Sequence, residues 1–352
     1  MKLYKQIIFI LIVFFKTETL FSKNDLFNVN NIKIVKKDKI SNNALANQAI
    51  VEGFNQLVEK ILLKDDNEKL GDVKSSMIKQ LVSYYRISNT DNVESNVESK
   101  EELVNFSITF DKDKIHDLFF KKGISYSEIL DKELYILPIL IKDNEINVFN
   151  NNFFYENWNK VYDNDLIEFV LPLENIEIIQ SINSYKNNLI NLDLKSLFKE
   201  YSNKNSVIIL IDESKIGNSK IYIKSIIQGK SISKNLELKT QNFKTNDSKF
   251  KIINELKEEL INLVKSKNLI DIRTPSFLNA KLDINKKSNL VELNKRTKNI
   301  DLIENIYVQD FNKDYMNLRI KYLGKLDNII SQLKKENINL QMIKDQWIIR
   351  TL

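Results

Sequence analysis

The spacing of apolar residues changes along the chain, and these changes divide residues 23–352 into three segments. In the first, residues 23–131, apolar positions from Ala46 to Ile61 recur at steps of three and four residues, which predicts an amphipathic helix. Gly53 lies within this apolar stripe, where the missing side chain would let another element approach closely. The other elements expected in this α+β segment are a strand at Ile32–Val35, a helix at Met77–Tyr85, a loop at Thr90–Glu102, a strand at Val104–Phe110 and a helix at Lys112–Lys121 that ends at Gly123.

The second segment, residues 132–275, contains apolar runs that are almost continuous, as in strands buried on both faces. Helical stretches separate these runs, so we expect them to form the parallel part of a sheet. Pro138 and Pro172 are expected near strand ends, where a missing amide donor is tolerated. The expected elements are strands at Leu134–Ile141, Leu166–Leu171, Val207–Ile211, Lys220–Ile227 and Leu236–Phe243, and helices at Phe153–Tyr162, Leu192–Tyr201 and Ile253–Val264.

Pro275 marks the start of the third segment, residues 276–352. Its predicted order βαββαβ is the split βαβ or ferredoxin-like arrangement. Its elements are expected at Lys281–Ile284, Ser288–Lys298, Ile306–Gln309, Tyr315–Tyr322, Leu326–Leu333 and Trp347–Ile349. The fold class that we predict is therefore α/β and α+β in three small domains, the middle one a mixed sheet with helices.

The first residues have the pattern of an export signal. Lys2 and Lys5 precede the apolar run Ile7–Phe15, and Lys16 ends this run too early for a bilayer span. We therefore expect residues 1–22 to be a signal peptide and the mature protein to be periplasmic. Because the chain lacks the acylated cysteine of a lipoprotein, any retention at a membrane would be non-covalent or through an uncleaved signal.

Composition excludes several kinds of chemistry. The chain has no cysteine, so disulfides, thiolate catalysis, iron–sulfur clusters and cysteine-based zinc sites are ruled out. Its six glycines are too dispersed for the phosphate loops of nucleotide enzymes. A net charge of +6 without a dense basic run does not indicate a nucleic-acid surface. We expect no cofactor, no metal and no nucleic-acid partner.

Four acidic residues mark the loops that we single out as a ligand or partner site. Glu174 and Glu177 follow the second apolar run of the middle segment, and Asp212 and Glu213 follow the third. Open α/β sheets bind ligands at the carboxyl ends of their strands. Because no histidine, arginine or metal ligand supports these carboxylates, we assign no catalytic residue.

Two further clusters have a structural interpretation. His116, the one histidine of the chain, lies near Asp111, Asp113 and Asp117, but a calcium loop counted from Asp111 would lack its glycine and its final glutamate. The acids instead favour the start of a helix. A similar fragment, typical of a turn, occurs at Asp310, Asn312 and Asp314.

Several stretches share apolar spacing and marked residues with a known group of sequences. They are Ala46–Leu63, Phe106–Gly123, Tyr135–Leu140 with Pro138, Trp158, Val170–Glu174 and Gly324–Trp347. Together they resemble an uncharacterised family of exported proteobacterial proteins, known only as a domain of unknown function. Related sequences often have Asp directly after the glutamate that corresponds to Glu174, whereas this chain has Asn175. The case for a pair of carboxylates at this place is therefore weaker.

In its order of strands and helices, the middle segment is also similar to the N-terminal domain of the periplasmic protein TolB and to related domains of secretion and flagellar outer-ring proteins. This resemblance implies binding to other envelope proteins rather than catalysis, and it assigns no functional residue. We expect a non-enzymatic scaffold or adaptor of the envelope whose partners are unidentified. A periplasmic hydrolase acting through the carboxylates and a carrier of an apolar ligand stay open as alternatives, and so does the oligomeric state.

Overall fold

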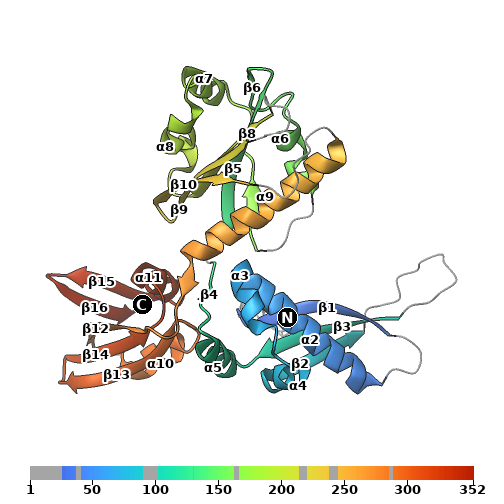
Figure 1. Cartoon of the computed structure of the whole chain (residues 1–352). Helices are drawn as coiled ribbons and strands as arrows, with labels where there is room; N and C mark the ends of the chain where they lie inside the picture. Colours follow the sequence, from blue (N-terminus) through green and yellow to red (C-terminus); the bar gives the residue numbers. More distant parts are fainter. Residues whose placement is uncertain are drawn as a thin grey trace, which may run out of the picture. The chain divides into compact units, whose positions relative to one another are not determined.

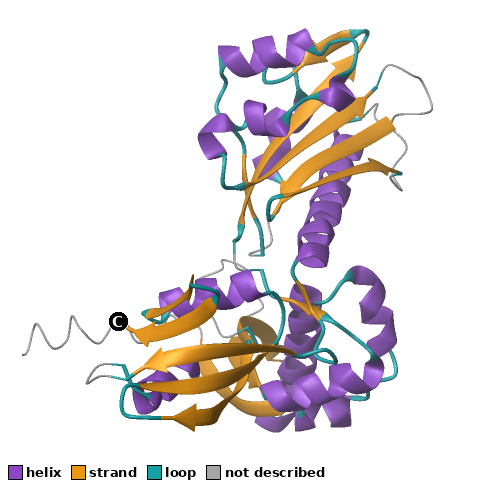
Figure 2. Ribbon diagram, turned by 90° about the vertical axis from the view of Figure 1, so that its left-hand side faces the viewer, coloured by secondary structure: helices purple, strands orange, loops and turns teal. Residues whose placement is uncertain are grey.

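A computed structural model describes residues 26–36, 41–89, 102–129, 131–161, 166–213, 220–237, 245–284 and 288–352. The predicted signal peptide and most of the predicted loop at Thr90–Glu102 lie outside these ranges. The chain forms two compact units, one running up to Lys60 and resuming over Asn67–Ile124, the other comprising Ile61–Asp66 and Ser125–Leu352. Both mix helices with strands, which confirms the predicted α/β and α+β class (Figures 1 and 2). The division into three domains stays a prediction.

The first unit is built on a three-stranded antiparallel sheet in the order β1-β3-β2, with the long helix α2 packed on it (Figure 1). Among the described residues its elements are β1 (Asn28–Lys36), α2 (Asn42–Ile61), η2 (Glu68–Leu70), α4 (Ser75–Gln80), β2 (Val82–Asn89), β3 (Glu102–Phe110) and α5 (Lys112–Lys122). The short helix α3 (Lys64–Asn67) spans the boundary between the two units.

Helix α2 approaches the sheet closely at Gly53, as predicted. A Cβ atom at this position would lie 2.8 Å from Cδ1 of Ile32 and 3.1 Å from Cδ1 of Ile108. Helix α5 also begins and ends where expected. The Asp111 side chain accepts the backbone N–H of Asp113 at 3.1 Å, and Gly123 ends the helix with a φ of 63°.

The helix predicted over Met77–Tyr85 is wrong in its second half. Helix α4 ends at Gln80, and Val82–Asn89 instead forms β2, which pairs with β3. Tyrosine, isoleucine and valine favour strands. An apolar pattern this short, however, fits the period of a helix as well as the period of a strand. Pairing with β3 therefore decides the conformation.

The second unit contains a six-stranded mixed sheet in the order β10-β9-β8-β5-β6, with β7 also beside β5. The β5 strand is parallel to β7 and β8, and the remaining pairs of this sheet are antiparallel. The described elements are β4 (Tyr126–Ser127), β5 (Glu133–Lys142), β6 (Glu145–Asn147), α6 (Phe153–Asn157), η3 (Trp158–Lys160), β7 (Glu168–Val170), α7 (Ile176–Ser184), η4 (Leu189–Asn191), α8 (Leu194–Leu197), η5 (Lys199–Tyr201), β8 (Asn205–Asp212), β9 (Lys220–Ile227), β10 (Lys230–Leu236), α9 (Asn246–Lys267) and β11 (Leu269–Ile270).

Both faces of this sheet are buried, which explains the continuous apolar runs. Ile136 and Ile209 belong to a core shared with α6 and α9, whereas Leu137 and Ile208 belong to a second core shared with α7 and α8. Neighbouring residues of β5 and β8 thus alternate between two cores, and Trp158 is fully buried in the first.

Pro138 lies in the middle of β5 rather than near its end, opposite Ile209 of β8. On the other side of β5, strand β7 pairs only with Glu133–Tyr135 and β6 only with Leu140–Lys142. The missing amide of Pro138 faces this gap, because its carbonyl oxygen accepts the Asn152 side-chain amide there at 2.9 Å. A proline in a central strand is tolerated here because no ladder bond is required of it.

Strand β10 is Lys230–Leu236, and it starts directly after a two-residue turn in which Gln228 and Gly229 have φ of 49° and 72°. Two consecutive residues with positive φ form a tight hairpin turn, so β10 directly follows β9. The strand predicted at Leu236–Phe243 lies outside the described residues except for Leu236 and Glu237.

The same unit ends in a five-stranded sheet in the order β13-β14-β12-β16-β15. Its elements are β12 (Ser276–Asp283), α10 (Leu290–Thr297), β13 (Ile303–Phe311), β14 (Tyr315–Tyr322), α11 (Leu326–Lys335), β15 (Ile338–Ile343) and β16 (Gln346–Thr351). The predicted βαββαβ order therefore needs correction to βαββαββ. The hairpin strand β16 lies parallel to β12 and separates it from β15.

The extra strand β15 was missed because its turn lacks the usual signal. Lys344 and Asp345 connect β15 to β16, and both have positive φ, at 46° and 61°. Such turns normally contain glycine or asparagine. With neither residue present, the sequence does not indicate a hairpin.

Candidate functional site

The four predicted site residues do not line one site. Glu174 and Glu177 lie on the side of the sheet that α7 and α8 cover, where both line a hollow. Asp212 ends β8 opposite Ile141, and Glu213 follows it and pairs with Lys249 of α9, which covers the other face. The structure therefore brings Glu174 together with Glu177, while Asp212 and Glu213 are not part of this lining.

Glu213 is held in the fold through both its backbone and its side chain. Its backbone N–H donates to the carbonyl oxygen of Ile141 at 2.8 Å, and its carboxylate pairs with Lys249 of α9 at 3.4 Å. Both side chains of this pair are largely buried. The pair holds the first turns of α9 to the end of β8.

Glu174 and Glu177 lie together in the lining of a hollow of about 760 Å³. The loop after β7 and helix α7 form one wall, and α8 with η5 forms the other. The lining consists of Pro172, Leu173, Glu174, Asn175, Glu177, Ile178, Ser181, Ser196, Leu197, Lys199, Glu200 and Tyr201.

Local hydrogen bonds fix the loop that leads into this hollow. The Tyr155 hydroxyl donates to the carbonyl oxygen of Pro172 at 2.8 Å, and the Asn150 amide donates to Glu174 at 3.1 Å. Burial, and then the charge of Glu174, raises the pKa of the Tyr155 phenol. Asn175 accepts the Glu177 N–H at 2.7 Å and caps α7.

The hollow combines an exposed aliphatic side chain with negative charge. Leu173 in the lining is 83% exposed, and Ile176, which lies outside the lining but between its residues Asn175 and Glu177 in sequence, is 71% exposed. Three carboxylates, Glu174, Glu177 and Glu200, line the hollow together with one cation, Lys199. This arrangement suits a ligand that brings apolar groups and positive charge.

Half of this site could not be found from the sequence. Helix α7 was not predicted, although Asn175 before an amphipathic run is the signal for its start. Glu200, Lys199 and Tyr201 come from the other wall, and no short-range pattern links them to Glu174. Tyr201 stacks on Tyr135 of β5 at 4.2 Å between ring centroids, which fixes that wall against the sheet.

The other candidate clusters have structural roles. The His116 ring packs edge to face on Phe27 at 5.6 Å. The Asn312 side chain accepts the N–H groups of Asp314 and Tyr315 at 2.9 and 3.0 Å, as predicted for a turn. Within the described ranges, no three His, Asp or Glu residues come together as metal ligands.

None of the described helices combines the length and the apolar content needed to cross a membrane. The chain matches no protein-family model, no curated protein and no solved structure with significance.

Proposed function

We propose that the protein is an exported, non-enzymatic scaffold or adaptor of the cell envelope, and that it docks another protein in the hollow between α7 and η5. The observation that carries this proposal is the highly exposed Leu173 in the lining of a concave acidic surface, with the exposed Ile176 next in sequence to residues of that lining. The sequence supports export through residues 1–22.

Size and shape favour a protein segment as the ligand. A hollow of about 760 Å³ is large enough for several side chains. Leu173 lines the hollow and Ile176 does not, so a ligand that covers both side chains must extend beyond the hollow. A segment of a folded or extended protein can do this.

Charge favours a basic partner. The lining has three carboxylates and one lysine, which gives it a net negative charge. Complementary charge accelerates association and selects against acidic partners. We therefore expect the docked segment to carry lysine or arginine next to aliphatic residues.

The two alternatives receive less support. A hydrolase acting through all four predicted carboxylates would need Asp212 and Glu213 beside Glu174, whereas the hollow is lined by Glu174 and Glu177 and the Glu213 carboxylate pairs with Lys249 of α9. A carrier for an apolar ligand would need a mainly apolar lining, whereas polar and charged side chains outnumber the apolar ones in this hollow.

The test is affinity purification of the tagged, full-length protein from envelope fractions of its own cells. Three forms are compared: the natural chain, Ile176→Ser combined with Glu177→Lys, and the control Glu145→Lys on β6. Glu145→Lys makes the same charge change as Glu177→Lys. It is a suitable control because Glu145 is exposed and lies outside the hollow.

We expect one envelope protein to be retained by the natural chain and by the control, to be lost from the double variant, and to dissociate as salt is raised. Its docking segment, made as a peptide, should bind the purified chain. Equal retention by all three forms would disprove docking in the hollow. Recovery of the natural chain in the cytosol would disprove the envelope role.

A further inference from the structure

The five-stranded sheet at the end of the second unit has a face that is open to solvent over its strands β13, β14 and β12 (Figure 1). Along β12, the buried Leu278, Ala280 and Leu282 alternate with Phe277 and Asn279, which are exposed. An alternation of this kind is typical of a sheet with one face in the core and the other in water. The exposed side chains of these three strands therefore form one surface.

An arginine lies between two exposed aromatic rings on this surface. Arg319 of β14 is opposite Tyr307 of β13, so both side chains point to the same face. The Arg319 guanidinium also lies over the Phe277 ring, with Cζ 4.3 Å from the ring centre. Arg319 is exposed, and Phe277 and Tyr307 are 47% and 45% exposed. Aromatic residues and arginine are enriched at protein interfaces, and tyrosine and arginine are frequent among the residues that dominate binding energy.

A second cation on this surface is held in the same way. Nζ of Lys281 lies 3.9 Å from the centre of the Tyr315 ring. Within the described ranges, neither Lys281 nor Arg319 forms an ion pair with a carboxylate, whereas Lys321 of the same sheet pairs with Glu304. A cation that rests on a ring keeps its charge available, and its side chain is already partly ordered, so less entropy is lost when a ligand binds.

We infer that this surface binds an acidic segment of another protein. We call it the Arg319 face, and its residues are Phe277, Lys281, Tyr307, Tyr315 and Arg319. Carboxylates of the segment pair with the two cations that lack an acidic partner within the described ranges, and its apolar side chains cover the exposed rings. Charge complementarity of this kind selects an acidic partner over a basic one.

The surroundings of the Arg319 face favour a protein over a nucleic acid or an anionic membrane. Three carboxylates belong to the same strands: Asp283 and Glu304 form ion pairs with neighbouring cations, and Asp310 accepts the Asn317 amide at 2.9 Å. A continuous polyanion would meet these carboxylates, and nucleic acids bind tightly through many phosphate contacts rather than two. A protein segment carries separate charges, which can lie opposite the two cations alone.

The Arg319 face differs from the other surfaces that could bind a partner. None of its residues lines the hollow, whose net charge has the opposite sign. On the sheet of the first unit, Arg86 over Tyr84 at 5.7 Å is a single ring–cation pair, so the contact that it offers is smaller. The inference does not depend on docking in the hollow, although a protein with both surfaces could bind one acidic and one basic segment.

The test measures binding of the purified full-length chain to an array of immobilised peptides of random sequence. We expect the natural chain to bind peptides that combine Asp or Glu with apolar residues. Lys281→Gln combined with Arg319→Gln should weaken this binding about tenfold, and so should Phe277→Ala, which keeps the net charge. The matched control, Lys334→Gln combined with Lys335→Gln, removes two exposed charges from α11 and should bind as the natural chain does. Circular dichroism spectra of all forms should be unchanged.

Two further ligands separate the possible partners: vesicles that contain phosphatidylglycerol, and single-stranded DNA. Tighter binding of either ligand than of any peptide would overturn the inference, and so would the absence of acidic peptides among those bound. Equal losses in the two double variants would also overturn it, because they would show that net charge alone attracts the peptides. The hollow variant, Ile176→Ser with Glu177→Lys, should still bind acidic peptides, so failure of docking in the hollow can be distinguished from failure at the Arg319 face.

Discussion

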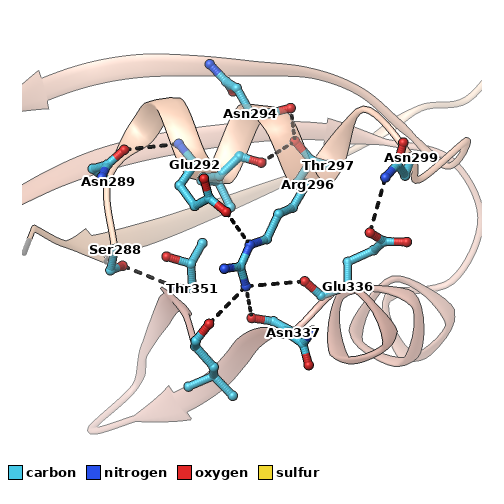
Figure 3. A network of polar contacts seen from close by, with 12 residues as sticks. Ser288, Asn289, Glu292, Asn294, Arg296, Thr297, Asn299, Glu336, Asn337 and Thr351 are labelled. Carbon is cyan, nitrogen blue, oxygen red and sulfur yellow. Dashed lines mark hydrogen bonds and ion pairs between the residues drawn. The ribbon is translucent and has the colours of Figure 1, made fainter. Parts of the chain in front are cut away.

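Arg296 and Asn337 are joined across 41 residues of chain by a hydrogen bond in which Nη1 of Arg296 donates to the Asn337 carbonyl oxygen at 2.8 Å (Figure 3). The same nitrogen donates to the carbonyl oxygen of Leu352 at 3.1 Å, and Nε donates to Glu292 at 2.8 Å. One guanidinium therefore connects helix α10 to the end of α11 and to the last residue of the chain. The Asn337 carbonyl lies just beyond the end of α11 and also accepts the backbone N–H of Leu352 at 2.9 Å, so the guanidinium is a second, charged donor to it.

Replacing Arg296 with methionine should lower the free energy of unfolding of the second unit by about 2 kcal/mol, because carbonyl acceptors lose a charged donor. Urea denaturation measures this loss. Glu292→Gln is the matched control, since it weakens the ion pair and keeps the carbonyl bonds. A loss as large in the control as in Arg296→Met would contradict the role of the carbonyl contacts.

Long periodic elements could be predicted from the sequence because a single buried face dictates them. Helices α2 and α9 and strands β3, β8 and β14 lie where the apolar spacing places them. The errors occur where the decisive contact is distant. Whether Val82–Asn89 is helix or strand depends on pairing with β3, and the hairpin turn at Lys344 and Asp345 depends on positive φ angles that these residue types do not indicate.

The candidate site was half predictable for a related reason. The positions of Glu174 and Glu177 after an apolar run indicate a strand end, and both residues do line the hollow. Strand length and register decide which strand ends meet, and neither can be derived from the run itself. The Glu213 carboxylate instead pairs with Lys249 of α9, which covers the opposite face of the sheet from α7 and α8.

Gly53 should tolerate alanine but not valine. Alanine gains about 1 kcal/mol of helix propensity, which offsets the strain of a Cβ atom placed 2.8 Å from the flexible end of Ile32. Valine adds two more carbon atoms toward Ile32 and Ile108, and such overpacking costs about 1–3 kcal/mol. Thermal unfolding of both variants measures the difference. Equal stability of the alanine and valine variants would mean that α2 and the sheet are farther apart at Gly53 than the distances to Ile32 and Ile108 indicate.

Tyr126 should make the second unit sensitive to alkaline pH. Burial, and then the nearby charge of Glu128, raises the pKa of its phenol far above the ordinary value of about 10. In the unfolded chain the phenol ionises near pH 10, whereas in the folded chain it keeps its proton. Stability from this group is therefore complete below pH 10 and is lost as the pH rises further, by up to about 1.4 kcal/mol per pH unit.

Urea denaturation between about pH 9 and 11 should thus show a steeper loss of stability in the natural chain than in Tyr126→Phe, which cannot ionise. Tyr185→Phe, at an exposed position on the surface, is the control and should follow the natural chain. Parallel pH profiles for the natural chain and Tyr126→Phe would show that Tyr126 does not contribute.

Asn152 and Asn175 offer the same substitution in two environments. Each side-chain oxygen caps a helix, α6 for Asn152 and α7 for Asn175. Only Asn152 also uses its amide group, which donates to the carbonyl oxygens of Pro138, Asn147 and Val148 at 2.9–3.0 Å, and it is fully buried. Aspartate keeps the capping oxygen in both places but supplies no donor.

Asn152→Asp should therefore destabilise the second unit by about 3 kcal/mol, because it buries a carboxylate among carbonyl oxygens that have lost their donor. Asn175→Asp should leave stability unchanged or raise it slightly, since a negative charge at the start of α7 is favourable. Chemical denaturation of the two variants under identical conditions separates capping from amide donation. Equal losses in both would mean that capping alone explains the asparagine at position 152, and that the three carbonyl contacts contribute nothing measurable.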